Sequence, residues 1–254
     1  MKKDYLPIHT TFERLASSYG LSSGMEEVNR GRLAPIVSEW EGRLLDVGAG
    51  TGAFISKYLD PAKHEIHVVD FSINMLKETQ KRLGPEIGRS VFPVNSIAQA
   101  LPFQRDSFDA AVSVNTLHNM PSMEDVRQAL AEMARVLRPR GVILVEFRNW
   151  NNQQRRRVCE LYDTVDLPQK AYTVETIGKE LEQLGFEIKR WIGLWGDHLP
   201  ENVMDEAIER VKMSFDRRKV TRAPRFAVLA EKSPGFRTIL KDASGNAAAE
   251  LQSE

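Results

Sequence analysis

The chain has 254 residues, 42% of them hydrophobic and 28% charged, which is enough to bury the core of one α/β domain without disulfides. Its 35 Lys and Arg residues balance 35 Asp and Glu residues, so no net charge attracts nucleic acid or an anionic membrane. The single cysteine excludes an intramolecular disulfide and a thiolate zinc site. With no signal peptide in residues 1–10 and no run long enough to span a bilayer, we expect a cytoplasmic protein.

The middle of the chain alternates between helical and strand-like patterns. Two helical pieces are expected within residues 9–38, with a break near 19–24. Short β-rich runs follow at 43–47, 65–69, 90–94, 108–114 and 141–147. Helical patterns separate them at 52–59, 73–83 and 123–137, and Ser122 is an expected N-cap with Asp125 in the first turn. This alternation predicts parallel strands with helical crossovers, in a doubly wound sheet.

The flanks of this pattern differ from its centre. Residues 149–170 are polar and basic, and a helix at 173–184, ending at Gly185, precedes a strand at 186–194. A helix is predicted at 202–218 and a closing strand at 226–230. We therefore expect an N-terminal helical cap at 1–39 and a main domain at 40–232 with a lid insertion at about 149–171. The tail, 233–254, is expected to be disordered.

The strongest motif is the block DVGAGTG, which runs from Asp46 to Gly52 between a strand and a helix. Glycine allows a tight turn there and lets a ligand approach the backbone closely. Asp70 ends the second strand, where a carboxylate can accept hydrogen bonds from both hydroxyls of a ribose. A nicotinamide dehydrogenase uses the same two features, so they do not by themselves select a cofactor.

Four blocks in order and spacing resemble the class I S-adenosylmethionine-dependent methyltransferases, within them the small-molecule group called type 11. The first is the glycine block, and the second is Val69-Asp70-Phe71-Ser72 with Met75-Leu76. The third runs from Leu101-Pro102-Phe103 to Val112, and the fourth is the turn at 135–141. The resemblance covers roughly residues 40–148. It implies S-adenosyl-L-methionine as the cofactor and a seven-stranded, mostly parallel sheet whose last strand, 226–230, is antiparallel beside 186–194.

The resemblance also implies roles for individual residues. Asp46 is expected to hold the amino-acid end of the cofactor, with Gly48 and Gly50 passing under it. Asp70 is expected to bind the ribose, and Phe71 to pack near the adenine. The full set of expected cofactor-binding residues is Asp46, Gly48, Ala49, Gly50, Gly52, Asp70, Phe71, Asn95, Ser96 and Asn115.

Two departures from the family pattern stand out. The family has an acid near the end of the third strand, where this chain has Asn95, whose carbonyl can still accept a bond from the adenine amino group. The family's Pro-Gly-Gly is Pro139-Arg140-Gly141 here, at a surface turn to which we attach no function.

Methyl transfer is an in-line displacement that mainly requires positioning, and a general base is needed only if the acceptor must lose a proton. His118, after the fourth strand, is the candidate base, but a histidine that only orders its loop is the preferred interpretation. The arginines at 155–157 could bind an anionic acceptor or could form a solvated helix face. No metal ligands are expected.

Three alternatives remain beside a small-molecule methyltransferase. A dehydrogenase would carry a Tyr-x-x-x-Lys motif, but Asp166 stands where Tyr162 would need its lysine. An RNA methyltransferase using residues 148–157 would normally bring a basic excess, so nucleic acid is not the expected partner. A non-catalytic cofactor-binding protein stays open.

Overall fold

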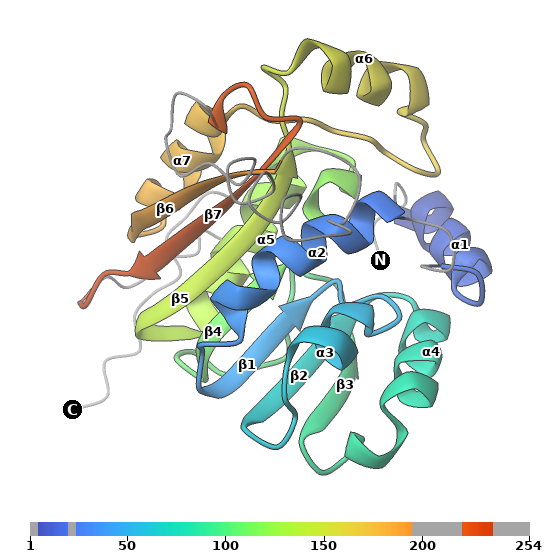
Figure 1. Ribbon diagram of the computed structural model, residues 1–254, viewed down its shortest axis with the longest axis vertical. Helices are drawn as coiled ribbons and strands as arrows, with labels where there is room; N and C mark the ends of the chain where they lie inside the picture. The colour runs from blue at the N-terminus through green and yellow to red at the C-terminus, as the bar shows by residue number, and fades with distance from the viewer. Residues whose placement is uncertain (1–4, 20–23, 195–219, 236–254) are drawn as a thin grey trace, which may run out of the picture.

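Seven strands form one sheet in the computed structural model, which describes residues 5–19, 24–194 and 220–235 (Figure 1). The strand order is β3-β2-β1-β4-β5-β7-β6, and β7 is antiparallel to both neighbours whereas the other pairs are parallel. The bounds are β1 Gly42–Val47, β2 His64–Asp70, β3 Val91–Asn95, β4 Phe108–Ser113, β5 Leu137–Arg148, β6 Phe186–Leu194 and β7 Arg225–Lys232. The predicted doubly wound sheet with an antiparallel last strand is confirmed.

Helices cover both faces of this sheet. Polar N-caps begin several of them: Ser72, Ser122, Asn152 and Thr173 each accept a backbone N–H from three residues ahead. The helices are α1 Tyr5–Leu15, α2 Gly24–Val37, α3 Ala53–Tyr58, α4 Ile73–Leu83, α5 Met123–Val136, α6 Gln153–Tyr162 and α7 Val174–Gln183. Two 3-10 turns are η1 Gly84–Glu86 and η2 Leu117–Asn119. The predicted helix at 202–218 and most of the predicted disordered tail lie outside the described residues.

The core has two layers because strand side chains alternate between the faces of the sheet. On β5, Val145 packs into the layer under α5 and α7, whereas Leu144 packs into the layer under α2, α3 and α4. Figure 1 shows these two groups of helices on opposite sides of the sheet. Leu130 of α5 and Leu33 of α2 are fully buried representatives of the two layers.

Strand β5 is longer than the predicted 141–147. Helix α5 ends at Val136, and Leu137, predicted to be helical, already pairs with Phe108 of β4. A register shift follows this pair, and Arg140 has φ 65° within the irregular stretch. The helical period therefore extended the predicted helix by one residue, into a segment that pairs with β4 in the sheet.

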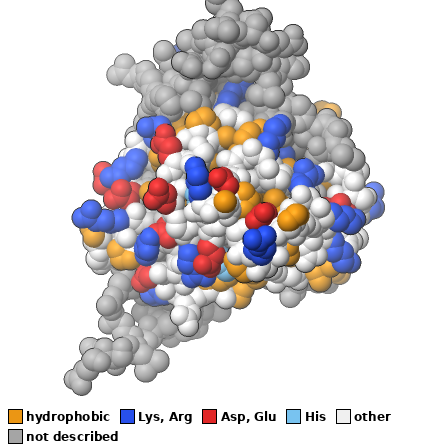
Figure 2. Space-filling model, turned by 60° about the horizontal axis from the view of Figure 1, so that its bottom comes forward, with side chains coloured by type: hydrophobic (Ala, Val, Ile, Leu, Met, Phe, Trp, Pro, Cys, Tyr) orange, Lys and Arg blue, Asp and Glu red, His pale blue; other side chains and the backbone are white. Residues whose placement is uncertain are grey.

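The sheet order reverses at β1, which pairs with β2 on one side and β4 on the other. Ligands of open α/β sheets bind beyond the carboxyl ends of the strands at such a point. Helix α1 lies at that end of the molecule, next to α4 (Figure 1). The face shown in Figure 2 carries acidic and basic side chains interspersed among apolar ones. In the described ranges, no helix is long and apolar enough to cross a membrane.

Candidate cofactor-binding site

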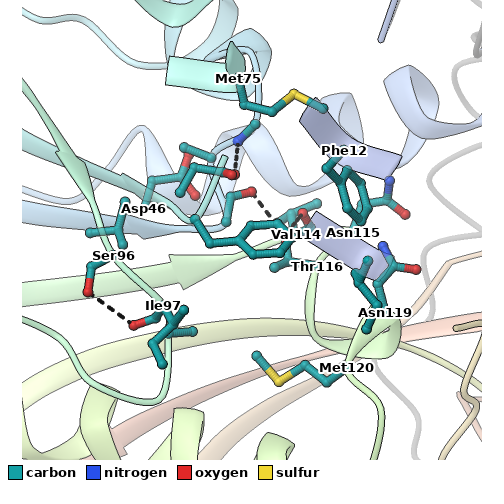
Figure 3. A pocket seen from close by; sticks show the side chains of 18 of the residues that line it. Phe12, Asp46, Met75, Ser96, Ile97, Val114, Asn115, Thr116, Asn119 and Met120 are labelled. Atoms are coloured by element: carbon teal, nitrogen blue, oxygen red, sulfur yellow. Dashed lines mark hydrogen bonds between the residues drawn. The ribbon is translucent and has the colours of Figure 1, made fainter. Parts of the chain in front are cut away.

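A cavity opens at the carboxyl ends of β1, β2 and β4, with an empty volume of about 910 Å³ that includes space open to solvent. Its floor comes from the turns after these strands and after β3, and its cover comes from α1 and α2. Figure 3 shows Met75 and Met120 at opposite margins, with Phe12 of α1 on the same side as Asn115 and Asn119. Eight of the ten predicted cofactor-binding residues line this cavity: Asp46, Gly48, Ala49, Gly50, Asp70, Phe71, Ser96 and Asn115.

Two glycines shape the turn after β1. Gly48 has φ 75°, and a Cβ atom on it would overlap the side chain of Thr116. The Gly48 N–H donates to the carbonyl of Val69 at 2.8 Å, and the Thr116 hydroxyl donates to the carbonyl of Gly48 at 3.0 Å. The turn is thus clamped between β2 and the segment after β4, and only glycine fits its first position.

Gly50 stands one step further along this turn, with φ 57°. Its N–H donates to Oδ2 of Asp70 at 2.8 Å, and its carbonyl accepts the hydroxyl of Thr79 at 2.8 Å. A Cβ atom on Gly50 would meet only Tyr19, at 3.9 Å, so this position faces open cavity. Gly52 differs, since it does not line the cavity and its missing Cβ makes room for Thr79.

Asp46, the penultimate residue of β1, has a deeply buried carboxylate. Its side chain is 3% exposed, and its Oδ2 has no hydrogen-bond partner. Burial raises the pKa of Asp46 to about 7, while Arg30 lowers it and Asp70 raises it. Arg30 belongs to α2, is buried, and lines the same cavity. An unpartnered carboxylate and a guanidinium therefore share this part of the cavity.

Asp70 ends β2, the strand that pairs with β1, and stands two residues beyond Val68, the register partner of Asp46. Its Oδ2 accepts from Gly50 and its Oδ1 accepts the N–H of Ser72 at 2.9 Å. Burial raises the pKa of Asp70 to about 6, and these two backbone hydrogen bonds counteract the effect of burial. The carboxylate is therefore mostly ionised at neutral pH, and each oxygen keeps a lone pair for a further donor.

Asn95 lies at the end of β3 but outside the cavity lining. Its side-chain amide donates to the carbonyls of Asp70 at 3.0 Å and Phe71 at 2.9 Å. In this geometry Asn95 braces the turn after β2, while Ser96 and the residues following it line the cavity.

Asn115 has φ 57°, a backbone conformation that asparagine tolerates better than most residues. Its N–H donates to Glu146 at 2.7 Å, and its Oδ1 accepts from Arg225 at 3.0 Å. Its amide group also donates to the hydroxyl of Tyr19 at 3.3 Å. Asn115 thus connects the cavity with the segment after α1 and with a buried ion pair, Arg225–Glu146, at 2.8 Å.

His118, the candidate base, lies in η2 and does not line the cavity. It is fully buried, and neither ring nitrogen has a hydrogen-bond partner. Burial, and then Arg148, Arg225 and Arg155, hold the pKa of His118 well below its usual range. The imidazole is neutral in this environment, and the adjacent Asn119 and Met120 face the cavity in its place.

Five cavity residues in the N-terminal segment carried no motif: Tyr5, Ile8, Phe12, Tyr19 and Arg30. Helix α1 is held over the cavity from α4, because the backbone N–H of Asn74 donates to Glu13 at 3.2 Å. Phe12 also makes an edge contact with Phe71, with ring centroids 5.7 Å apart. Aromatic residues in the segment before the glycine block are a sequence signal for Tyr5, Phe12 and Tyr19, whereas Ile8 and Arg30 have none.

The insertion after β5 does not contribute to the cavity wall. Residues 149–171 are all described, and none of them lines the cavity. A β-bridge between Asn149 and Tyr172 joins the two ends of the insertion just beyond β5. The N–H of Lys170 donates to the carbonyl of His118 at 2.9 Å. The insertion therefore packs against the segment after β4.

Comparisons with known proteins agree with this geometry. Residues 45–145 match a family model described as a methyltransferase domain. A ubiquinone/menaquinone biosynthesis C-methyltransferase UbiE from Shewanella sp. (strain W3-18-1) is 31% identical over 66% of this chain and 67% of its own length. A demethylmenaquinone methyltransferase from Clavibacter sepedonicus is 29% identical over 72% and 76%. A UbiE protein from Paracoccus denitrificans is 35% identical, but the match spans only 57% of that relative's length.

Solved structures show the same fold. A Thermotoga maritima S-adenosylmethionine-dependent methyltransferase, described as a possible histamine N-methyltransferase, superposes with a TM-score of 0.66 at 20% identity, covering 89% of this chain and 100% of the other. With the cavity at the switch point and the two buried carboxylates, the fold is that of an S-adenosylmethionine-dependent methyltransferase. The chain belongs to the class I S-adenosylmethionine-dependent methyltransferases of the type 11 group, enzymes whose cofactor is S-adenosyl-L-methionine.

Proposed function

We propose that this chain transfers a methyl group from S-adenosylmethionine to a ring carbon of a small, electron-rich acceptor. The observation that carries the cofactor's placement is the unpartnered Oδ2 of Asp46, buried beside Arg30. The amino-acid end of the cofactor has an ammonium and a carboxylate, which require one acceptor and one cation. Asp46 and Arg30 supply these two charges in a buried space where charged hydrogen bonds are strong.

The remaining parts of the cofactor fit the neighbouring residues. The carboxylate of Asp70 has lone pairs for the ribose hydroxyls, and the open side of Gly50 allows close approach of a ligand. Phe71 and Ile97 offer apolar surface for the adenine between β2 and β3. When bound, the cofactor supplies an activated methyl group on a sulfonium. The chain's own residues then orient the acceptor and exclude water from the cavity.

Two observations support the proposed class of acceptor: the names of the relatives and the apolar surface of the cavity wall. Two relatives are named as a C-methyltransferase and a demethylmenaquinone methyltransferase. In this chain, Tyr5, Ile8 and Phe12 of α1 present aromatic and aliphatic surface to the cavity opposite Met120. Such surface suits a flat apolar ring. A sulfonium methyl is electrophilic, so the ring must be electron-rich, as a hydroxyarene or quinol is and a quinone is not.

The N-terminal segment acts as the lid in this proposal. Helix α1 is tied to the rest of the site by Glu13, by Tyr19 and by Tyr5, whose hydroxyl accepts a hydrogen bond from Gln99. Aromatic contacts of α1 with Phe71 add to these polar contacts, so α1 covers the cavity and must move aside for an acceptor to enter. The insertion 149–171 then supports the segment after β4, to which Lys170 is hydrogen-bonded.

The test is transfer of a labelled methyl group from S-adenosylmethionine to demethylmenaquinone, offered both as the quinol and as the quinone. We expect label in the quinol, with a mass increase of one methylene located on the ring by fragmentation. The Gly50→Ala variant is the matched inactive control. A second arm offers a metabolite extract, and the proposal fails if S-adenosylhomocysteine binds but neither arm incorporates label.

A further inference from the structure

The hydroxyl group of Tyr5, at the start of α1, connects the cavity with a buried carboxylate. Tyr5 and Gln99 both line the cavity. The oxygen of the Tyr5 hydroxyl accepts a hydrogen bond from the side-chain amide of Gln99, in the segment between β3 and β4. The hydroxyl itself donates to Asp125, in the first turn of α5, and Asp125 does not line the cavity. One phenol therefore lies between the space for a ligand and a carboxylate set back from that space.

Asp125 is held in place as an acceptor of hydrogen bonds. It is 6% exposed. The hydroxyl of Ser122, the N-cap of α5, donates to Oδ2 of Asp125 at 2.6 Å and accepts the N–H of Asp125 at 3.2 Å. The N-terminus of a helix also favours a negative charge within its first turn. Asp125 is therefore a fixed carboxylate that receives hydrogen bonds from Ser122 and from Tyr5.

Tyr5 keeps its own proton in this environment. Burial, and then the charge of Asp125, raise the pKa of Tyr5, whereas the hydrogen bond from Gln99 lowers it. Tyr172 also acts on Tyr5. The pKa of Tyr172 is raised by burial, and then by Asp125 and Asp163. A neutral phenol is a weak base by itself, but it can accept one proton while it passes its own proton to a carboxylate.

The proposed reaction requires a group that removes a proton. The ring carbon of a hydroxyarene is a stronger nucleophile once the hydroxyl has lost its proton, because the negative charge is shared with the ring. His118 is fully buried and does not line the cavity, so it is not placed to take this proton. Tyr5 lines the same wall as Ile8 and Phe12, against which the acceptor ring is proposed to lie. Because α1 is the lid, Tyr5 bonds to Asp125 with the lid over the cavity.

We propose that Tyr5 and Asp125 form a proton relay that ionises a hydroxyl group of the methyl acceptor. This inference rests on the proposed function and assigns the base of that reaction. The proton of the acceptor's hydroxyl passes to the oxygen of Tyr5, and the phenolic proton of Tyr5 passes to Asp125. Tyr5 stays neutral throughout, and Asp125 becomes a neutral acid.

The remaining bonds and protons balance without a further reactant. The ring carbon bonds to the methyl carbon, and the bond between that carbon and sulfur breaks with its electron pair left on sulfur. The ring carbon then loses its hydrogen as a proton to water. Asp125 returns its proton through Tyr5 to the ring oxygen, which restores the hydroxyl group of the product and the carboxylate of the relay.

The kinetic experiment follows methyl transfer to demethylmenaquinol, without oxygen, between pH 7 and pH 9. In the parent chain we expect the rate to change little with pH, because the relay ionises the acceptor within the site. Tyr5→Phe and Asp125→Asn should be at least about a hundredfold slower at pH 7, the contribution typical of a positioned base. Their rates should rise roughly tenfold per pH unit, because only acceptor that has ionised in solution then reacts. Tyr172→Phe is the matched control: it removes a phenol that also interacts with Asp125 but does not line the cavity, and it should keep the rate and profile of the parent.

A second measurement needs no turnover. Each chain is saturated with S-adenosylhomocysteine, and 4-nitrophenol, whose absorbance reports its ionisation, is added at a pH below its own pKa. We expect the bound probe to be more ionised than the free probe in the parent and in Tyr172→Phe, but not in Tyr5→Phe or Asp125→Asn. Affinity for S-adenosylhomocysteine should be the same in all four chains.

The inference is overturned if Tyr5→Phe keeps the rate and pH profile of the parent, or if its only defect is a weaker affinity for S-adenosylhomocysteine. Equal ionisation of the bound nitrophenol in the parent and in Tyr5→Phe overturns it as well. A parent chain that methylates no quinol would instead remove the proposed function, and the ionisation of nitrophenol would then decide the relay alone.

Discussion

The N–H of Gly50 donates to Oδ2 of Asp70 across 2.8 Å, which joins the turn after β1 to the end of β2. The other oxygen of Asp70 accepts from Ser72, at the start of α4. Asp70 therefore has two functions at once: it organises the glycine turn and it presents a carboxylate to the cavity. The effects of replacing it separate these functions.

Asp70→Ala is expected to weaken S-adenosylhomocysteine at least tenfold and also to lower the thermal midpoint without ligand. Two backbone donors lose their acceptor, at about 1–3 kcal/mol for each one left buried and unsatisfied. Calorimetry and thermal denaturation measure the two effects. Asn95→Ala is the matched control, because Asn95 braces the same turn without lining the cavity, and it is expected to change the dissociation constant far less. Equal affinities in both variants would contradict a ribose contact by Asp70.

Cofactor affinity is expected to depend on pH through Asp46. Its pKa is raised to about 7 by burial, and the ammonium of the cofactor requires the ionised form. Below pH 7 the apparent dissociation constant should therefore rise about tenfold per pH unit. The amino group itself stays protonated in this range, since even the less basic α-amino group of a chain terminus has a pKa of about 7.7–8.0. Titrations with S-adenosylhomocysteine between pH 5.5 and 7.5 test this, and Asp46→Asn should remove much of the slope. An identical slope in the variant would place the titration elsewhere.

The same carboxylate should reduce the stability of the ligand-free protein near neutral pH. The folded-state pKa is raised from 3.8 to about 7. The free energy of unfolding is therefore highest below pH 4, where the carboxyl group is protonated in both states, and it falls as pH rises from 4 through 7. Asp46→Asn should therefore unfold at higher urea concentration than the parent at pH 7.5, with little difference near pH 4. The pKa difference corresponds to at most about 4 kcal/mol. A variant less stable than its parent at pH 7.5 would show that the carboxylate has a stabilising partner.

Two glycine replacements should differ in their effects. Gly50→Ala adds a Cβ that meets only Tyr19 at 3.9 Å, so the protein should fold, with roughly 1–2 kcal/mol of strain from the positive φ. The same Cβ projects into the cavity and should abolish cofactor binding. Gly48→Ala instead overlaps Thr116 and should destabilise the fold itself. Thermal midpoints and S-adenosylhomocysteine affinities of the two variants distinguish these outcomes, and tight binding by Gly50→Ala would place the cofactor elsewhere.

His118→Ala should leave the shape of the pH–rate profile intact once an acceptor is known. The imidazole is buried behind the cavity wall and its pKa lies well below the usual range, so it does not titrate as the base near neutral pH. We expect less than about a tenfold loss in kcat. A hundredfold fall in kcat together with loss of the acidic limb would establish His118 as the base.

The sequence determined the sheet and the turn that carries the site. The spacing of apolar residues located the seven strands, because buried side chains repeat at one spacing along a strand and at another along a helix. The strand at 186–194 was predicted to the residue, and β7 was placed beside it through the family resemblance. The glycine block and Asp70 were readable because a tight turn and a ribose-facing acid each demand particular residue types at short range.

The tertiary structure alone decided what surrounds that turn. Arg30 reaches the cavity with Asp46, and α1 covers it, through contacts such as Glu13 with Asn74 that join residues 61 positions apart. His118 lies next to cavity residues in the sequence, yet its side chain is fully buried and does not line the cavity. Such placements depend on how whole elements pack against one another. Local periodicity indicates which side of an element is buried but not which partner buries it. The lid, the charge beside Asp46 and the burial of His118 could therefore not be predicted from the sequence.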